Sequence, residues 1–158
     1  RNHGGDGSDF LHVGTNGRLD TLQAAVVLAK LPHFDNELER RRLLARRYTE
    51  NLADICSVPS ISVGDAHVFT PYTIRVRHRD QVRAALAEVG VPTAIYYPRC
   101  LHQQPAYATF AKVGEFPIAE KAAGEVLSLP LYPFLLETEQ DLVIREVRSA
   151  VKRLSDSS

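Results

Sequence analysis

The sequence has no excess of charge of either sign and no apolar run long enough to cross a membrane. Its 19 basic and 19 acidic side chains cancel, so no overall field attracts nucleic acid or an anionic membrane, and we expect neither as a partner. The longest apolar run, LSLPLYPFLL, contains a serine and two prolines and is much shorter than the ~20 residues that a membrane span needs. No signal peptide is recognisable either.

Cysteines and catalytic signature motifs are also scarce. Cys56 and Cys100 are the only two cysteines, far apart and in no CxxC pair, which is typical of a reducing compartment. We therefore expect a cytoplasmic protein with two buried thiols. The sequence has no GxSxG elbow, no GxxxxGK phosphate loop and no HExxH helix. No other histidine or acid lies at metal-ligand spacing from His102, so the sequence predicts no metal site.

The chain has enough apolar residues for a core. Its 158 residues are 44% apolar, sufficient for one compact domain that buries roughly 70% of its unfolded surface. It begins with Arg1 rather than Met and runs at once into the polar stretch NHGGDGSDF. We interpret it as a segment of something longer, although a processed or trimmed N-terminus would look the same.

The first third of the chain predicts a loop followed by a long helix. Residues 1–18 are glycine-rich and polar, as loops are. A helix is expected over 19–56, begun by a capping box between Asp20 and Gln23 and kinked or divided near Pro32. Its charged run ELERRRLLARRY is interpreted as a solvated face.

The remainder predicts a small open sheet covered by helices, in an α/β fold. Later elements are expected in this order: a strand in HVFTPYTIRVR, a helix over 79–90, a strand over 93–97, a helix leading into a strand over 121–131, and a helix from about Thr138. Pro71 indicates an edge strand or a bulge, and Gly90 a helix C-cap. We assign 57–154 to a small C-terminal domain and expect the tail 155–158 to be disordered.

The loop GTNGR indicates an anion site. It leads into a helix N-terminus, where free amides and the aligned peptide dipoles favour negative charge. Gly14 and Gly17 allow close approach of the backbone, Asn16 offers an amide donor, and Arg18 offers a planar fork that suits phosphate or carboxylate. A phosphate or sugar-phosphate ligand fits this loop. The alternative is that Asn16 and Gly17 form an ordinary turn and Arg18 pairs with a surface acid, and for this loop taken alone the alternative is favoured.

A second candidate loop is YYPRCLHQQPAY, residues 96–107. Its two prolines predict a stiff, irregular segment after a strand, a position where specificity residues commonly lie. His102 could act as a general base, donate a hydrogen bond to a ligand, or be a surface side chain. Without a partner in the sequence, the surface interpretation is favoured.

Five segments, taken together and in order, are more specific than either loop alone. They are RNHG, VGTNGRLDTLQAA, HVFTPYTIRV, GVPTAIYYPRCLHQQPAY and FPIAEKAAGEVLSLPLYP. This set resembles the carboxyl-terminal half of sugar aminotransferases of the DegT/StrS type, from Arg1 to about Ala150. Within that family it is most similar to enzymes that aminate keto-sugars attached to nucleoside diphosphates, including the 3-oxo-glucuronate aminotransferases of surface-polysaccharide pathways.

The resemblance implies a fold, a cofactor and an assembly. The family resembles aspartate aminotransferase (fold type I), with a large pyridoxal-phosphate domain, a small C-terminal domain, and a homodimer whose active sites lie at the subunit interface. Residues 1–18 would then be a loop remaining from the large domain, and residues 19–56 the interdomain helix. Nucleotide-sugar and an amino-acid donor would be the substrates.

The resemblance also implies roles for particular residues. Asn16 would reach the cofactor phosphate of the neighbouring subunit. The substrate-binding residues would be Arg18, Tyr96, Tyr97, His102 and His3. Where relatives usually carry a proline, this sequence has Cys100, which leaves the shape of that loop and the sugar preference open.

The resemblance places the essential lysine outside this chain. Transamination needs a lysine that holds the cofactor as a Schiff base and then moves a proton; the family supplies it upstream. None of the lysines here, Lys30, Lys112, Lys121 and Lys152, lies in the matching motif, so we expect no catalytic residue and no activity from this chain alone. The favoured hypothesis is part of an enzyme that takes its amino group from glutamate. The alternative is a truncated, catalytically dead module that binds a nucleotide-sugar or a partner.

Overall fold

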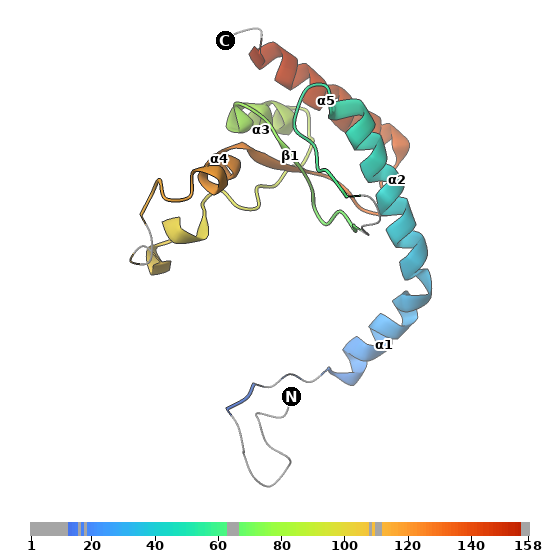
Figure 1. The fold of residues 1–158 in the computed structure, drawn as a ribbon. Coiled ribbons are helices and arrows are strands. Elements are labelled where there is room, and N and C mark those ends of the chain that lie inside the picture. Colours follow the sequence, from blue (N-terminus) through green and yellow to red (C-terminus); the bar gives the residue numbers. More distant parts are fainter. Residues whose placement is uncertain are drawn as a thin grey trace. The chain divides into compact units, whose positions relative to one another are not determined.

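The structure is a computed structural model that describes residues 13–15, 17, 19–62, 67–107, 109 and 112–155 (Figure 1). The chain divides into two compact units, Arg1–Glu37 and Leu38–Ser158. Within the described ranges, no helix is both long enough and apolar enough to span a membrane.

The first unit contains helix α1 and the break that follows it. Helix α1 spans Thr21–Lys30, and a 3-10 turn, η1, spans Leu31–His33 before α2 begins at Phe34. The interruption lies at Pro32, whose ring and missing N–H disrupt the helical hydrogen bonds, so the predicted division is confirmed. No residue of α1 is buried.

The predicted capping box at the start of α1 is wrong. Asp20 is the N-cap residue, but its side chain makes no capping hydrogen bond. Its backbone carbonyl accepts from the N–H of Ala24 at 2.8 Å. Because Thr21, Leu22 and Gln23 are exposed, water can satisfy the N–H groups of this turn without the carboxylate.

The second unit is built on a two-stranded antiparallel sheet. Strand β1 (Tyr72–Arg75) pairs with β2 (Val126–Leu129), in a register that sets Ile74 opposite Leu127. Single bridges extend the pairing on both sides, from Ser57 to Arg75 and from Ala94 to Ser128.

Two of the strand predictions need correction. The stretch 93–97 contributes only the bridge at Ala94, because Pro92 and Pro98 on either side have no N–H to continue a ladder. The strand predicted in HVFTPYTIRVR is shorter than expected, since β1 starts directly after Pro71 and Val68 is exposed. The third strand, which follows a helix, is present as β2 after α4 (Pro117–Glu125).

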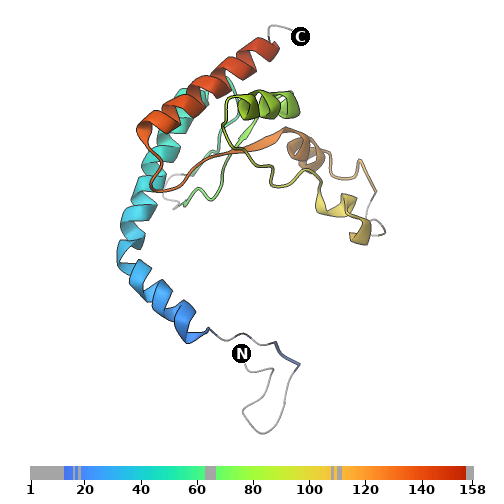
Figure 2. The same cartoon turned by 180° about the vertical axis from the view of Figure 1, so that it is seen from behind.

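Helices α2, α3 and α5 build the core against the sheet. Their bounds are Phe34–Leu52, Arg79–Glu88 and Glu137–Ser155, and α2 and α5 lie side by side in both views (Figures 1 and 2). The fully buried core side chains are Ala45, Tyr48, Leu52, Tyr72, Ile74, Val82, Leu86, Leu127 and Val147. The expected small sheet covered by helices is therefore present, as helices packed on two strands.

The ends of two helices follow local sequence signals. Gly90 adopts a φ of 75°, and the N–H groups of Gly90 and Val91 donate to the carbonyls of Ala87 and Leu86, which is the Schellman arrangement expected of a glycine C-cap. Helix α5 begins within one residue of Thr138 and ends at Ser155. Ser155 is thus helical rather than part of a disordered tail, and residues 156–158 lie outside the described residues.

The charged run on α2 is only partly a solvated face. Arg40 donates to the carbonyl of Leu135 at 3.3 Å, and Arg41 to that of Leu131 at 3.2 Å. Their long side chains can reach carbonyls that lie about 90 residues away in sequence and have no partner in a helix or strand. The solvated-face prediction is wrong for these arginines.

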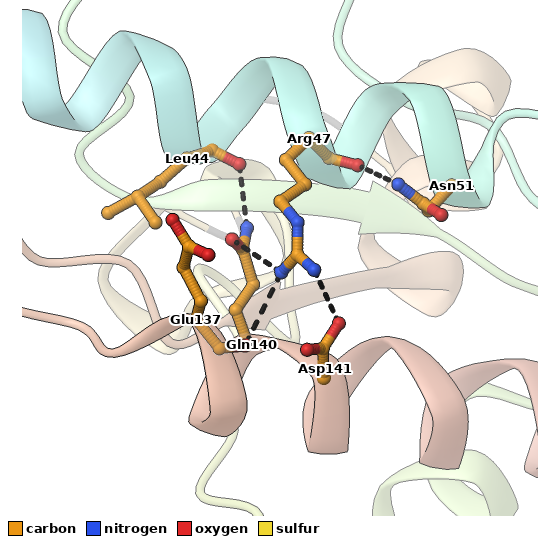
Figure 3. A network of polar contacts seen from close by, with 6 residues as sticks. All are labelled: Leu44, Arg47, Asn51, Glu137, Gln140 and Asp141. Atoms are coloured by element: carbon orange, nitrogen blue, oxygen red, sulfur yellow. Dashed lines mark hydrogen bonds and ion pairs between the residues drawn. The ribbon is translucent and has the colours of Figure 1, made fainter.

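A polar network joins α2 to α5 (Figure 3). Arg47 donates to Oε1 of Gln140 at 3.2 Å and to the carbonyl of Glu137 at 3.4 Å. It also pairs with the carboxylate of Asp141. The side-chain amide of the buried Gln140 donates to the carbonyl of Leu44 at 2.7 Å. The network therefore fixes the two long helices of this unit to each other.

Both cysteines are free, but neither is fully buried as predicted. Cys56 and Cys100 each retain intermediate exposure. Burial still raises the pKa of the Cys56 thiol to about 11, and its sulfur lies 3.4 Å from the carbonyl of Leu52.

Candidate functional site

The loop at residues 96–107 brings two exposed tyrosines together. It follows the bridge at Ala94, whose N–H and carbonyl are both hydrogen-bonded to Ser128. Tyr96 and Tyr97 come next, with their ring centroids 5.8 Å apart in an edge-on arrangement. They are 54% and 72% exposed. Two large, amphipathic rings are thus available to a ligand, and hydroxyl and ring edges of this kind suit a sugar or a nucleotide.

The rest of this loop is ordered by its own hydrogen bonds. It contains two 3-10 turns, η2 (Leu101–Gln103) and η3 (Pro105–Tyr107). The backbone N–H of Cys100 donates to Oε1 of Gln103 at 2.9 Å. A proline at position 100 could not make this bond, because it has no N–H. The predicted stiff, irregular loop is confirmed, and Cys100 takes part in the local order that stiffens it.

His102 points away from solvent, toward α4. Only 10% of its side chain is exposed, and its Nε2 lies 2.8 Å from Oε1 of Glu120. Its ring centroid is 4.9 Å from that of Phe116. The interpretation of His102 as a surface side chain is therefore wrong. Its hydrogen bond and its ring contact are both with residues at the start of α4.

Glu120 is a residue of this region that the sequence analysis missed. Its Oε1 also accepts from the backbone N–H of Gly114 at 2.7 Å, and Gly114 adopts a φ of 94°, which favours glycine. The hydrogen bonds from Gly114 and His102 lower the pKa of the Glu120 carboxyl. A carboxylate in the first turn is also stabilised by the helix dipole. The signal in the sequence was an acid three residues after Pro117, because proline is typical of a helix start.

Three of the predicted site residues lie outside the described residues. They are His3, Asn16 and Arg18. The anion loop at residues 14–18, which contains Asn16 and Arg18, and the role of His3 therefore stay predictions. Of the predicted substrate-binding set, the structure thus places Tyr96 and Tyr97 together on an exposed loop and ties His102 to α4.

The sequence that carries these elements matches one protein family. Residues 1–148 match the sequence profile of the DegT/DnrJ/EryC1/StrS aminotransferase family. The chain belongs to this family. Aminotransferases of the family depend on pyridoxal 5'-phosphate, and solved relatives include forms that carry pyridoxal or pyridoxamine phosphate.

Individual relatives agree with this assignment. The pleiotropic regulatory protein of Geobacillus stearothermophilus is 44% identical over 153 residues, which are 93% of this chain and 41% of that protein. The UDP-2-acetamido-2-deoxy-3-oxo-D-glucuronate aminotransferase of Pseudomonas aeruginosa is 42% identical over 126 residues, 79% of this chain and 34% of that protein. DesV of S. venezuelae, solved with a ketimine intermediate, matches with a TM-score of 0.90 and 37% identity over 96% of this chain and 42% of DesV.

The chain spans about two fifths of the length of these relatives. The similarity covers nearly all of the chain, including the loop that carries the tyrosines.

Proposed function

We propose that this chain is the C-terminal portion of a pyridoxal-phosphate-dependent aminotransferase that transfers an amino group from glutamate to a nucleotide-linked keto-sugar. The observation that carries this proposal is the match to DesV across 96% of the chain, with a TM-score of 0.90. The identity to the P. aeruginosa aminotransferase supports a nucleotide-linked keto-sugar as the substrate class. We further propose a place in polysaccharide or amino-sugar biosynthesis, in the cytoplasm.

The proposal includes a large domain and a second subunit. Coverage of only 34–42% of the relatives supports a longer polypeptide whose cofactor domain precedes this chain. Residues 1–18 would be the last loop of that domain and 57–154 the small domain. Residues 19–56 would be the interdomain segment, in which α1 and α2 end at Lys30 and Leu52. We further propose a homodimer with shared active sites, because Asn16 would serve the cofactor phosphate of the neighbouring subunit.

The exposed tyrosines are the substrate-facing groups that the structure supports best. Tyr96 and Tyr97 would contact the nucleotide-sugar together with Arg18 and His3, which lie before α1 in the sequence. His102 belongs to the same loop as the tyrosines, and its Nε2 is already occupied by Glu120. Within this loop, the sugar would therefore contact the rings of Tyr96 and Tyr97 rather than His102.

The lysines of the chain are poor candidates for the Schiff base. Lys30, Lys112, Lys121 and Lys152 are all exposed, whereas a Schiff-base lysine must be held against the cofactor in an enclosed site. The pyridoxal cofactor supplies the electron sink for amino transfer. This chain would supply substrate contacts and no catalytic lysine, and so would be inactive alone.

The test compares the 158-residue chain with the complete polypeptide that contains it. Each is mixed with pyridoxal phosphate, followed by aldimine absorbance, reduced with borohydride and mapped by mass spectrometry. We expect an adduct in the complete polypeptide, on a lysine outside this chain, and glutamate-dependent amination of a UDP-linked keto-sugar. An adduct on one of the four lysines here would contradict the proposal.

A regulatory or binding function is the second candidate. It is favoured by the similarity to the G. stearothermophilus relative, which is named a pleiotropic regulatory protein. A complete polypeptide that binds the nucleotide-sugar but forms no aldimine would support this alternative and overturn the enzymatic one.

A further inference from the structure

We propose that Glu120 is a positioning residue that, through His102, holds the loop at residues 96–107 in the form that presents Tyr96 and Tyr97. As far as it concerns substrate, this inference rests on the proposed function. The loop geometry on which it depends is independent of that function.

One carboxylate oxygen of Glu120 ties three segments together. Oε1 accepts from His102 in η2 at 2.8 Å and from the backbone of Gly114, in the turn before α4, at 2.7 Å. Only 10% of the His102 side chain and 18% of that of Glu120 are exposed. Water therefore has little access to replace these bonds, and a partner left without its bond in such a site loses free energy.

Hydrogen bonds within the loop give it local order, but buried apolar side chains add little to its position. Neither η2 nor η3 contains a buried residue, so apolar packing contributes little to its position. On its N-terminal side the loop is fixed by the pair of backbone hydrogen bonds between Ala94 and Ser128. After the tyrosines, the bond from His102 to Glu120 ties the loop to α4. The tyrosines lie between these two ties.

The charge state of the pair suits this role. The hydrogen bond from Gly114, then that from His102, lowers the pKa of Glu120, so the group is a carboxylate that accepts and Nε2 of His102 is the donor. Lys121, the neighbouring cation on α4, lies 4.0 Å from Glu125, and Glu115 in the preceding turn is exposed. Oε1 of Glu120 thus bonds to the loop and to the turn.

Loss of the Glu120 carboxylate should affect the half-reaction with the nucleotide-sugar and not the half-reaction with the amino donor. Loosening the loop would disturb the contacts of Tyr96 and Tyr97 with the nucleotide-sugar while leaving the reaction with the amino donor intact. Because a hydrogen bond to a charged group is being removed, we expect Glu120→Ala to raise KM for the nucleotide-sugar by about tenfold. KM for glutamate and the rate of the glutamate half-reaction should stay within about twofold.

The experiment uses the complete polypeptide and three variants. Glu120→Ala removes the acceptor, Glu120→Gln keeps an oxygen that can accept from His102 and Gly114, and Glu115→Ala is the matched control, an exposed acid in the same region. Amide hydrogen exchange is measured over residues 96–107 without substrate, beside the two KM values. We expect faster exchange by about tenfold in Glu120→Ala only, with Glu120→Gln close to the parent.

The outcomes separate the inference from the proposed function. Unchanged exchange in Glu120→Ala would overturn the inference, whatever the enzyme does. Faster exchange throughout the protein, or loss of both half-reactions, would also overturn it, since the residue would then stabilise the fold generally. Local loosening in a polypeptide that aminates no keto-sugar would support the inference and contradict the proposed function.

Discussion

The side-chain amide of Gln140 is completely buried and donates to the backbone carbonyl of Leu44, 2.7 Å away on a neighbouring helix (Figure 3). Its Oε1 accepts from Arg47 at the same time. A polar group with no exposed surface is favourable only when it is hydrogen-bonded. The contact between α2 and α5 therefore depends on this residue as well as on apolar packing.

Replacing Gln140 with leucine should destabilise the fold. The variant removes the hydrogen bonds that this side chain makes to Arg47 and to the carbonyl of Leu44. We therefore expect the free energy of unfolding to fall by about 1–3 kcal/mol. Urea denaturation measures it. Ser149→Ala, at an exposed position of α5, is the control and should stay within about 0.5 kcal/mol. A stability equal to that of the parent would show that the network contributes nothing.

Stability should fall in alkaline solution. Burial raises the pKa of Cys56 from 9.0 to about 11 and that of Tyr72 from 10.0 to about 12. Each group then stays protonated in the folded chain while the unfolded chain ionises. The contribution of each buried, protonated group to stability is therefore complete below the pKa that the group has in the unfolded chain. It is lost as the pH rises through the pKa that the group has in the folded chain.

Urea unfolding between pH 9 and pH 12 tests this dependence. We expect a decrease of about 1–2 kcal/mol for each group across its window, smaller for Cys56 because solvent screens its partly exposed thiol. Tyr72→Phe should make the part between pH 10 and pH 12 less steep, although the buried Tyr48, whose pKa burial also raises, still contributes there. Tyr97→Phe, at a 72% exposed side chain, should leave the slope unchanged. A flat profile in the parent would contradict the burial of both groups.

Two glycines should respond to alanine with opposite signs. Gly90 has a φ of 75°, where an alanine is strained, so Gly90→Ala should lower stability by about 1–2 kcal/mol. Gly124 lies in α4, and a Cβ there would meet nothing within 4 Å. Gly124→Ala should raise stability by up to about 1 kcal/mol. Thermal or urea unfolding of the two variants gives the comparison, and equal effects would refute the conformational explanation.

The apolar residues of α1 should cause self-association of the isolated chain. Leu22 and Val26 are 79% and 54% exposed and are one helical turn apart; exposed apolar patches of this kind associate. We expect the apparent mass to rise with concentration by light scattering, and Leu22→Ser with Val26→Ser to reduce this rise. Gln23→Ser is the control. An equally associating double variant would exclude α1 as the cause.

Arg18→Ala in the complete polypeptide tests the predicted anion loop. If Arg18 contacts the phosphates of the nucleotide-sugar, its loss should weaken kcat/KM for that substrate by about 1–3 kcal/mol. Arg83→Ala, on the exposed side of α3, is the matched loss of a cation and should have little effect. Unchanged kinetics in Arg18→Ala would remove the residue from the site.

The sequence by itself determined the features that depend on one residue or on neighbours in the chain. Pro32 interrupts the first helical stretch and Gly90 ends α3, because each restricts or permits backbone dihedrals locally. The ordered loop motifs were likewise sufficient to identify the family, because they are recognised from the order of residues alone and do not depend on how the chain packs.

Only the tertiary structure decided the features that join distant segments. It reduced the sheet to two strands, turned Arg40 and Arg41 toward carbonyls far along the chain, and joined His102 to Glu120. Such hydrogen bonds form only when the helices have packed. Burial and the distance between the two groups, rather than local backbone dihedrals, determine which of these bonds stabilise the fold.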